Sequence, residues 1–173
     1  MRTLHVLRHA KSSWAEAGQP DHERPLAPRG EQAALRIAEH LRKRSITPDL
    51  VLCSTARRTQ ATLAALRPVW PADITVSIEE GLYGATADEL LSRIHDVDDT
   101  IGSLLVIGHN PGSHDLAMRL AGSGDEALID DLSVNLPTGA LATLTFDGSW
   151  RELDRGAARL AAFVVPRSLP DVR

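Results

Sequence analysis

The chain has 173 residues, of which 43% are hydrophobic and 24% are charged, and its formal net charge is −4. This length suits one domain with a substantial core, and the charge argues against a broad surface for nucleic acid or anionic membranes, although it leaves room for a local basic pocket. No apolar run is long enough to span a bilayer, no signal-peptide pattern precedes the first strand, and the single cysteine, Cys53, excludes an internal disulfide. We therefore expect a cytoplasmic, monomeric protein.

Strand and helix patterns alternate along residues 1–100. An apolar run near the start predicts a strand, and further on Ala34, Ile37 and Leu41 recur at helical spacing. Thr86 is suited to cap the N-terminus of a later helix. In chain order, the predicted elements are a strand over 3–8, a helix over 30–44, a strand over 50–53, a helix over 55–66, a strand over 74–76 and a helix over 86–96.

The second part of the chain contains the strongest strand pattern, residues 103–108, followed by a predicted helix over 112–121. Residues 140–146 alternate enough between apolar and polar side chains to predict a more exposed strand, at an edge of the sheet. Residues 160–166 predict the last strand.

This alternation of strands and helices predicts a three-layer α/β/α sandwich, in which a mostly parallel central sheet has helices on both faces. Two connections, 15–29 and 122–139, are expected to be loops. One domain is expected over residues 1–166, and residues 167–173 are expected to form a loosely held C-terminal tail.

Three of the predicted strands end in polar, reactive side chains. Arg8 and His9 follow the first strand, the segment from Ser54 to Arg58 follows the second, and His109 follows the fourth. Ligands of open α/β sheets bind at the carboxyl ends of the strands, so we expect these side chains to meet in one site. Arginine presents a fork of donors that matches phosphate oxygens, and neutral imidazole can act as a nucleophile. The pattern therefore points to phosphoryl transfer.

Five segments of the chain resemble the histidine phosphatase superfamily, which includes phosphoglycerate mutases and acid phosphatases. LRHAKSSW (7–14) is similar to its RHG-type signature, with Ala10 where the wider superfamily has Gly. The other segments, in the order of the family, are DHERPLAPRG (21–30), CSTARRTQATL (53–63), EGLYGATADELL (80–91) and LLVIGHNPG (104–112). Together they resemble the small SixA-type phosphohistidine phosphatases.

The resemblance implies a phosphoglycerate mutase-like fold and a role for each matching residue. His9 would attack phosphorus and become a transient phosphohistidine. Arg8, Arg58 and His109 would surround the phosphoryl oxygens. Arg24, in the Arg-Pro-Leu segment, is similar to a further arginine of the SixA-type phosphate pocket.

Two neighbouring arginines compete for one of these roles. Arg58 lies four residues after Ser54, as the family pattern requires, and Arg57 does not. On a helix that begins near Thr55, adjacent residues point about 100° apart, so only one of the two arginines can face the site.

The general acid is the role that the residues leave most open. Mutases of the superfamily carry a glutamate three residues before a tyrosine, and Glu80 stands in that relation to Tyr83. A phosphoramidate leaves as a readily protonated imidazole and needs no such acid, whereas an alkoxide leaving group does. Glu80 is therefore either a catalytic acid for alcohol phosphates, in a broad-specificity small-molecule phosphomonoesterase, or a solvated residue after a strand.

Two other interpretations of the polar residues are weaker. Two histidine pairs have the spacing of zinc ligands, but no cysteine or acidic residue completes a structural site, so no metal is expected. These pairs are His5 with His9 and His109 with His114. The loop of a cysteine phosphatase needs five residues between its Cys and Arg, and four separate Cys53 from Arg58, so Cys53 is interpreted as a small buried hydrophobic residue.

Phosphohistidine on a protein is the preferred substrate, with no cofactor. Short connections between the central elements predict a shallow, open site, which would admit a side chain on a protein such as a histidine-phosphotransfer domain as well as a small phosphoester. Neither nucleic acid nor a membrane is expected as a partner. A hypothesis of another class is a non-catalytic module that binds phosphohistidine or phosphate, and the presence of both histidines and the arginines argues against it. Whether Lys11 and Asn110 touch substrate, and what Trp14 covers, stay open.

Overall fold

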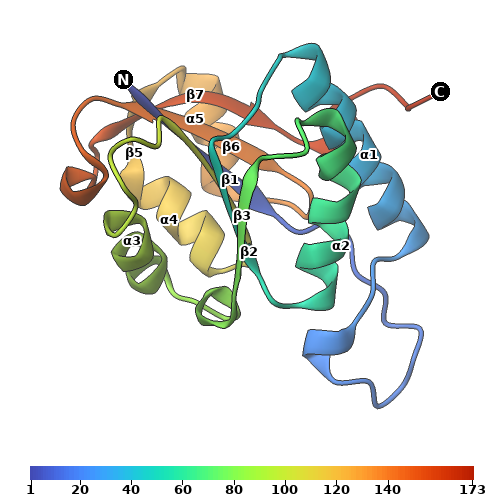
Figure 1. The fold of residues 1–173 in the computed structure, drawn as a ribbon. Helices are drawn as coiled ribbons and strands as arrows, with labels where there is room; N and C mark the ends of the chain where they lie inside the picture. Colours follow the sequence, from blue (N-terminus) through green and yellow to red (C-terminus); the bar gives the residue numbers. More distant parts are fainter.

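The computed structural model describes all 173 residues and places seven strands in one sheet with helices on both sides (Figure 1). The strands are β1 (Arg2–Arg8), β2 (Leu50–Ser54), β3 (Thr75–Glu79), β4 (Ser103–Gly108), β5 (Ala121–Gly124), β6 (Leu141–Phe146) and β7 (Ala158–Val164). The helices are α1 (Pro28–Lys43), α2 (Arg57–Leu66), α3 (Ala87–His95), α4 (Gly112–Leu120) and α5 (Glu126–Val134). None of them combines the length and the apolar surface that a membrane span requires.

The strand order in the sheet is β3-β2-β4-β1-β6-β7-β5. Strands β3, β2, β4 and β1 run parallel to one another, and β5 runs parallel to β7, whereas β6 runs antiparallel to both β1 and β7. Connections between parallel strands must cross over the sheet, so the helices cover both of its faces. The predicted three-layer α/β/α sandwich with a mostly parallel sheet is confirmed.

Two hydrophobic cores lie under the two helical layers. Successive side chains of a strand point to opposite faces, so in β1 Leu4 and Val6 belong to the core beneath α3, α4 and α5, and Leu7 belongs to the core beneath α1 and α2. The apolar run of β4 divides between the two cores in the same way. A strand that is buried on both faces has a continuous apolar sequence, which is why β4 gave the strongest signal.

Strand β6 lies inside the sheet, where the alternation of residues 140–146 had predicted an edge. It pairs with β1 on one side and β7 on the other. The alternation has an internal cause, because the hydroxyl of Thr143 hydrogen-bonds Nδ1 of His5, 2.9 Å away on the neighbouring strand. The polar position of β6 thus faces a polar partner within the protein.

Residues 122–139 contain an edge strand and a helix where a loop was expected. Strand β5 consists of Ala, Gly, Ser and Gly and carries no apolar pattern. Its Gly122 lies so close to the chain at Gly156 that a Cβ atom would be 2.0 Å from the Gly156 carbonyl oxygen. Helix α5 follows, with Asp125 as its N-cap, where a carboxylate oxygen accepts from the amide of Ala127 at 2.9 Å.

Strands β1, β2 and β4 end at the same edge of the sheet, which we call the site edge. Because β6 runs antiparallel to β1, the residues before β6 reach this edge too, and the Gly139 amide donates to the carbonyls of Arg8 (3.0 Å) and His9 (2.9 Å). Helix α1 begins there as well. A Cβ atom on its Gly30 would lie 2.0 Å from the carbonyl oxygen of Lys11, so the helix packs directly against the segment that follows β1.

Candidate active site

The four residues of the predicted phosphate site meet at the site edge. Arg8 ends β1 and His9 follows it, Arg58 lies in the first turn of α2, and His109 follows β4. The register of β1 and β4 pairs Arg8 with Gly108, which places His9 and His109 side by side with their ring centroids 5.3 Å apart. Arg58 contacts both rings. We call these four side chains the histidine–arginine cluster.

The two neighbouring arginines of α2 point in different directions. Arg58 is 6% exposed, and its Nε donates to Nε2 of His9 at 3.3 Å. Arg57 is exposed and reaches only the carbonyl oxygen of Glu23, at 3.5 Å. This difference follows from the rotation of about 100° per residue in a helix, and it agrees with the choice of Arg58 from the sequence.

Nε2 of His9 is unprotonated and carries the lone pair of the ring. Its Nδ1 lies 2.7 Å from the carbonyl oxygen of Ala10, which can only accept, so Nδ1 carries the proton. Nε2 accepts from Arg58. Burial lowers the pKa of His9 to about 3, and the charges of Arg58 and Arg8 act in the same direction. The ring is therefore neutral near pH 7 and can act as a nucleophile through Nε2.

His109 is held between a hydroxyl and a guanidinium. Its Nε2 lies 2.7 Å from the hydroxyl oxygen of Ser54, and its Nδ1 accepts from Nη2 of Arg58 at 3.4 Å. Burial lowers its pKa to about 4, with the charge of Arg58 as the next cause. An anion bound beside the ring would favour the protonated form, which could then donate to that anion.

Arg8 and Arg58 are two cations in one enclosed site. Nη1 of Arg8 donates to the carbonyl oxygen of Leu136 at 3.2 Å, whereas its Nε is buried without a hydrogen-bond partner in the protein. Burial lowers the pKa of Arg8, and the like charge of Arg58 lowers it further. Buried N–H groups without a partner are rare, and paired cations repel, so both observations point to an anion as the ligand.

Asp21 and Tyr83 complete the site, although the sequence did not single them out for it. One carboxylate oxygen of Asp21 accepts from the hydroxyl of Tyr83 at 2.6 Å and from Nη2 of Arg58 at 2.9 Å. The ring of Tyr83 stands edge-on to that of His109, with centroids 5.4 Å apart. The hydrogen bond from Tyr83, and then those from Arg58 and Arg24, hold the pKa of Asp21 well below its usual range. The sequence offered one signal for this contact, because the carboxylate of Asp21 stands three residues before Arg24.

Arg24 lies beside the carboxylate of Asp21, which in turn contacts Arg58 of the histidine–arginine cluster. Its Nη1 donates to the other oxygen of Asp21 at 3.1 Å and its Nη2 to the hydroxyl of Ser12 at 2.6 Å. Its guanidinium carbon lies 3.1 Å from the centroid of the Trp14 ring, which is 75% exposed. The structure thus connects Arg24 to Arg58 through Asp21, with no direct contact between the two arginines.

Glu80 stands apart from the other predicted residues. It opens the single turn of 3-10 helix Glu80–Leu82, it is exposed, and no hydrogen bond or ion pair joins its side chain to the cluster. Tyr83, three residues later, makes the contacts with the site instead. The structure therefore brings together Arg8, His9, Arg58 and His109 and leaves Glu80 at the surface.

Two residues whose roles the sequence left open are placed by the structure. The side-chain amide of Asn110 donates to the carbonyl of Leu136 at 2.9 Å, the same carbonyl that accepts from Arg8. Asn110 therefore ties the segment before β6 to the end of β4. Lys11 is exposed at the site edge.

The histidines and the cysteine outside the cluster have other partners. No group of three or more His, Cys, Asp or Glu side chains is arranged to hold a metal ion. His114 Nε2 lies 2.6 Å from the carbonyl oxygen of Leu132. Cys53 is completely buried in the core beneath α1 and α2, and burial raises the pKa of its thiol to about 12. Cys53 is a buried hydrophobic residue, as interpreted from its spacing.

The site is more enclosed than the short connections had predicted. His9, Arg58 and His109 are 6%, 6% and 8% exposed. The segment after β1 borders the cluster, since Ser12 pairs with Leu26 in an isolated β-bridge and Asp21 contacts Arg58.

Mild acid is expected to destabilise the protein. Burial lowers the pKa of four histidines from 6.5, and the three largest shifts are to about 4 for His5, about 3 for His9 and about 4 for His109, with His40 shifted in the same direction. The unfolded chain therefore binds these protons more readily, so the free energy of unfolding is greatest above about pH 7 and falls as the pH decreases from 6.5 towards 4. Near pH 5 the slope approaches ~4 kcal/mol per pH unit, from about 1.4 kcal/mol for each of three protons. Urea denaturation across this range measures it.

His5→Asn is the matched control for this prediction, because His5 lies in the same strand as Arg8 but outside the site. The variant should lower the slope by about one third, since one of the three protons is removed. A free energy of unfolding that stays constant between pH 7 and pH 5 would contradict the neutral state of the two site histidines.

The chain is similar to known proteins over most of its length. The model of the histidine phosphatase superfamily (branch 1) matches residues 4–96. An uncharacterized protein of Mycobacterium tuberculosis (strain H37Rv) is 40% identical over 163 residues, which cover 93% of this chain and 100% of the relative. An uncharacterized protein of Mycobacterium leprae is 36% identical over 166 residues, with 93% and 100% covered.

Solved structures show the same fold. A candidate phosphohistidine phosphatase SixA from Nakamurella multipartitia has a TM-score of 0.82 and 32% identity, over 95% of this chain and 96% of that one. The protein histidine phosphatase SixA complexed with tungstate has a TM-score of 0.69 and 20% identity, over 96% and 98%, and at this identity it supports the fold alone. The likeness extends over both helical layers and the whole sheet.

Proposed function

Because the chain belongs to the histidine phosphatase superfamily, as a compact member of SixA type, we propose that it removes the phosphoryl group from phosphohistidine on a protein substrate. The reaction proceeds without a metal, through a phosphohistidine formed on His9. The observation that carries the proposal is the unprotonated Nε2 of His9, which contacts Arg58 and lies in the same cluster as the unpaired Nε of Arg8. A nucleophile and two anion-binding donors lie within one buried cluster.

In the first step, the Nε2 lone pair of His9 attacks phosphorus and forms a P–N bond. The P–N bond of the substrate breaks, and its electron pair stays on the leaving imidazole, which takes up a proton from solvent. Arg8 and Arg58 bind the phosphoryl oxygens and stabilise the charge that they carry in the transition state. His109, protonated once the anion is bound, donates to a further oxygen.

In the second step, water attacks the phosphoryl group on His9 and the P–N bond to His9 breaks. One proton of the water leaves, inorganic phosphate is released, and the lone pair on Nε2 is restored. Proton release at Nδ1 is not needed, since Nδ1 keeps its hydrogen bond to the carbonyl of Ala10 throughout.

The position of Glu80 supports one class of leaving group. An alkoxide requires an acid beside the departing oxygen, and Glu80 makes no contact with the histidine–arginine cluster. An imidazole leaving group has no such requirement. This favours a phosphoramidate over an alcohol phosphate, and the likeness to SixA-type proteins favours phosphohistidine among the phosphoramidates.

The test is to assay the purified protein, in the presence of a chelator, on a phosphorylated histidine-phosphotransfer domain and on p-nitrophenyl phosphate. We expect the phosphorylated domain to be hydrolysed with the higher kcat/KM. Hydrolysis of the aryl phosphate alone would favour a small-molecule phosphomonoesterase. Stoichiometric binding of the phosphorylated domain without turnover would favour a binding module, and loss of turnover with the chelator would exclude the metal-independent reaction.

A further inference from the structure

A basic cavity of about 420 Å³ lies at the site edge, next to the histidine–arginine cluster. Four of its lining residues are cationic, Lys11, Arg29, Arg36 and Arg167, and none is acidic. They come from three parts of the chain, namely the segment after β1, helix α1 and the turn after β7. We call this feature the basic cavity.

The charges of the basic cavity are only partly neutralised by the protein. Arg36 forms an ion pair with Asp171 near the C-terminus. Lys11, Arg29 and Arg167 are exposed and form no ion pair. The chain as a whole carries a net charge of −4, so this concentration of cations runs against its overall sign. Cations gathered in a cavity without acids indicate an anionic ligand.

The basic cavity is joined to the cluster by the backbone. Lys11 lies two residues after His9, and its carbonyl accepts from the Ala27 amide at 2.8 Å, just before α1. Thr138 also lines the cavity, and the amide of the next residue, Gly139, donates to the carbonyl of His9. The basic cavity and the cluster are therefore built on adjacent residues of the same two segments.

We propose that the basic cavity binds acidic side chains that surround the phosphohistidine on the protein substrate. This proposal rests on the proposed function. It specifies the substrate class as proteins whose phosphohistidine is surrounded by acidic side chains. The cavity is larger than a single carboxylate or phosphate, and its cations are spread over three segments, so it fits several carboxylates on a surface better than one compact anion. The cations raise the rate of encounter and the affinity for an acidic partner.

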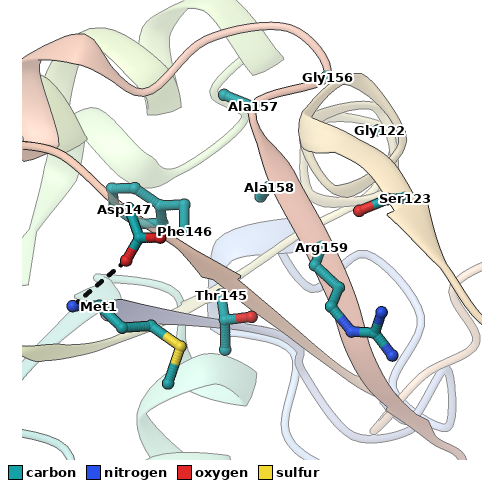
Figure 2. Close-up of a pocket in the computed structure, with 10 residues that line it drawn as sticks. All are labelled: Met1, Gly122, Ser123, Thr145, Phe146, Asp147, Gly156, Ala157, Ala158 and Arg159. Carbon is teal, nitrogen blue, oxygen red and sulfur yellow. Dashed lines mark ion pairs between the residues drawn. The ribbon is translucent and has the colours of Figure 1, made fainter.

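The test uses the double variant Arg29→Glu/Arg167→Glu, which reverses two free charges of the basic cavity. Arg29 lies in the first turn of α1, where a negative side chain favours the helix dipole, so the variant should fold. The matched control is Arg155→Glu/Arg159→Glu, with the same change in net charge. Arg159 lines a second cavity together with Met1, at the opposite end of β1 from His9 (Figure 2). Thermal unfolding of both variants checks the fold.

The substrates are two short synthetic peptides, each with one phosphohistidine, which is flanked by glutamates in one and by glutamines in the other. At low salt the wild type should have a kcat/KM about tenfold higher on the glutamate peptide, because each exposed ion pair contributes modestly and several add. The double variant should lose this preference, and the control variant should keep it. Turnover of p-nitrophenyl phosphate should stay within about twofold of wild type in both.

Each other outcome contradicts a defined part of the proposal. An equal loss on both peptides and on p-nitrophenyl phosphate, or the same loss in the control variant, would overturn the basic cavity as a docking site. A wild type that hydrolyses both peptides equally would overturn it while leaving the phosphatase intact. If neither peptide is hydrolysed, the proposed function is wrong. Binding of the unphosphorylated glutamate peptide then tests the basic cavity by itself. Stronger competition by a linear alkyl bisphosphate than by that peptide would assign the cavity to a small ligand instead.

Discussion

His9→Ala is expected to reduce turnover of phosphohistidine by at least ~10³-fold, because the substitution removes the only atom placed to form the P–N bond. The neighbouring donors remain in this variant, so substrate binding should be lost to a smaller extent than kcat. The measurement combines steady-state kinetics with brief incubation on labelled substrate and an acid quench. The wild type should carry a label that is labile in acid and stable in base, and His9→Ala should carry none.

His5→Asn supplies the control for this experiment. His5 is also a buried histidine of β1, but its Nδ1 bonds Thr143 and it lies outside the histidine–arginine cluster. This variant should retain the label and most of the activity. Full turnover by His9→Ala would remove the proposed mechanism, whatever the substrate proves to be.

Arg58→Ala is expected to lower kcat/KM by a hundredfold or more, which corresponds to a loss of about 3 kcal/mol of transition-state stabilisation. Arg58 contacts both histidines and is buried, so its charge acts at short range with little screening by solvent. Arg58→Lys should recover only part of the loss, because an ammonium group lacks the planar fork that binds two oxygens.

Arg57→Ala is the matched control, since Arg57 is the adjacent residue of the same helix and points to solvent. Its kcat/KM should remain within a few-fold of wild type, as expected of exposed substitutions. A loss of less than tenfold in Arg58→Ala would contradict the assignment of this residue to the phosphoryl oxygens.

The central elements and the cluster could be predicted from the sequence because their signals are local. Strands β1 and β4 are buried on both faces, so β4 has a continuous apolar run that ends at Gly108, directly before His109, and β1 is apolar from Leu4 to Leu7 except at His5, with Arg8 and His9 following. The carboxyl ends of parallel strands share an edge of the sheet, which brings His9 and His109 together once the fold class is known. Thr86 accepts from the Glu89 amide in a capping box, as its position before α3 indicated.

The parts that were missed depend on contacts between distant residues. Asp21 reaches Arg58 across 37 positions and Tyr83 across 62, and neither separation leaves a periodic pattern in the chain. Strand β5 is defined by its pairing with β7, since small residues have no hydrophobic pattern of their own. Helix α5 had usable signals in Asp125 and in its apolar residues, of which only Leu132 is fully buried, and the acidic residues Glu126, Asp130 and Asp131 interrupt this apolar pattern.

The carboxylate of Asp21 has a consequence for buffer ions. In the unliganded protein Arg58 already has a counter-ion, and this counter-ion is tethered by the chain and oriented by Tyr83 and Arg24. A mobile anion must compete with the high effective concentration of a tethered group. Chloride, with one charge and no second point of attachment, competes poorly, whereas a dianion that engages Arg8 and Arg58 together can prevail. We therefore expect chloride to bind only weakly at the histidine–arginine cluster.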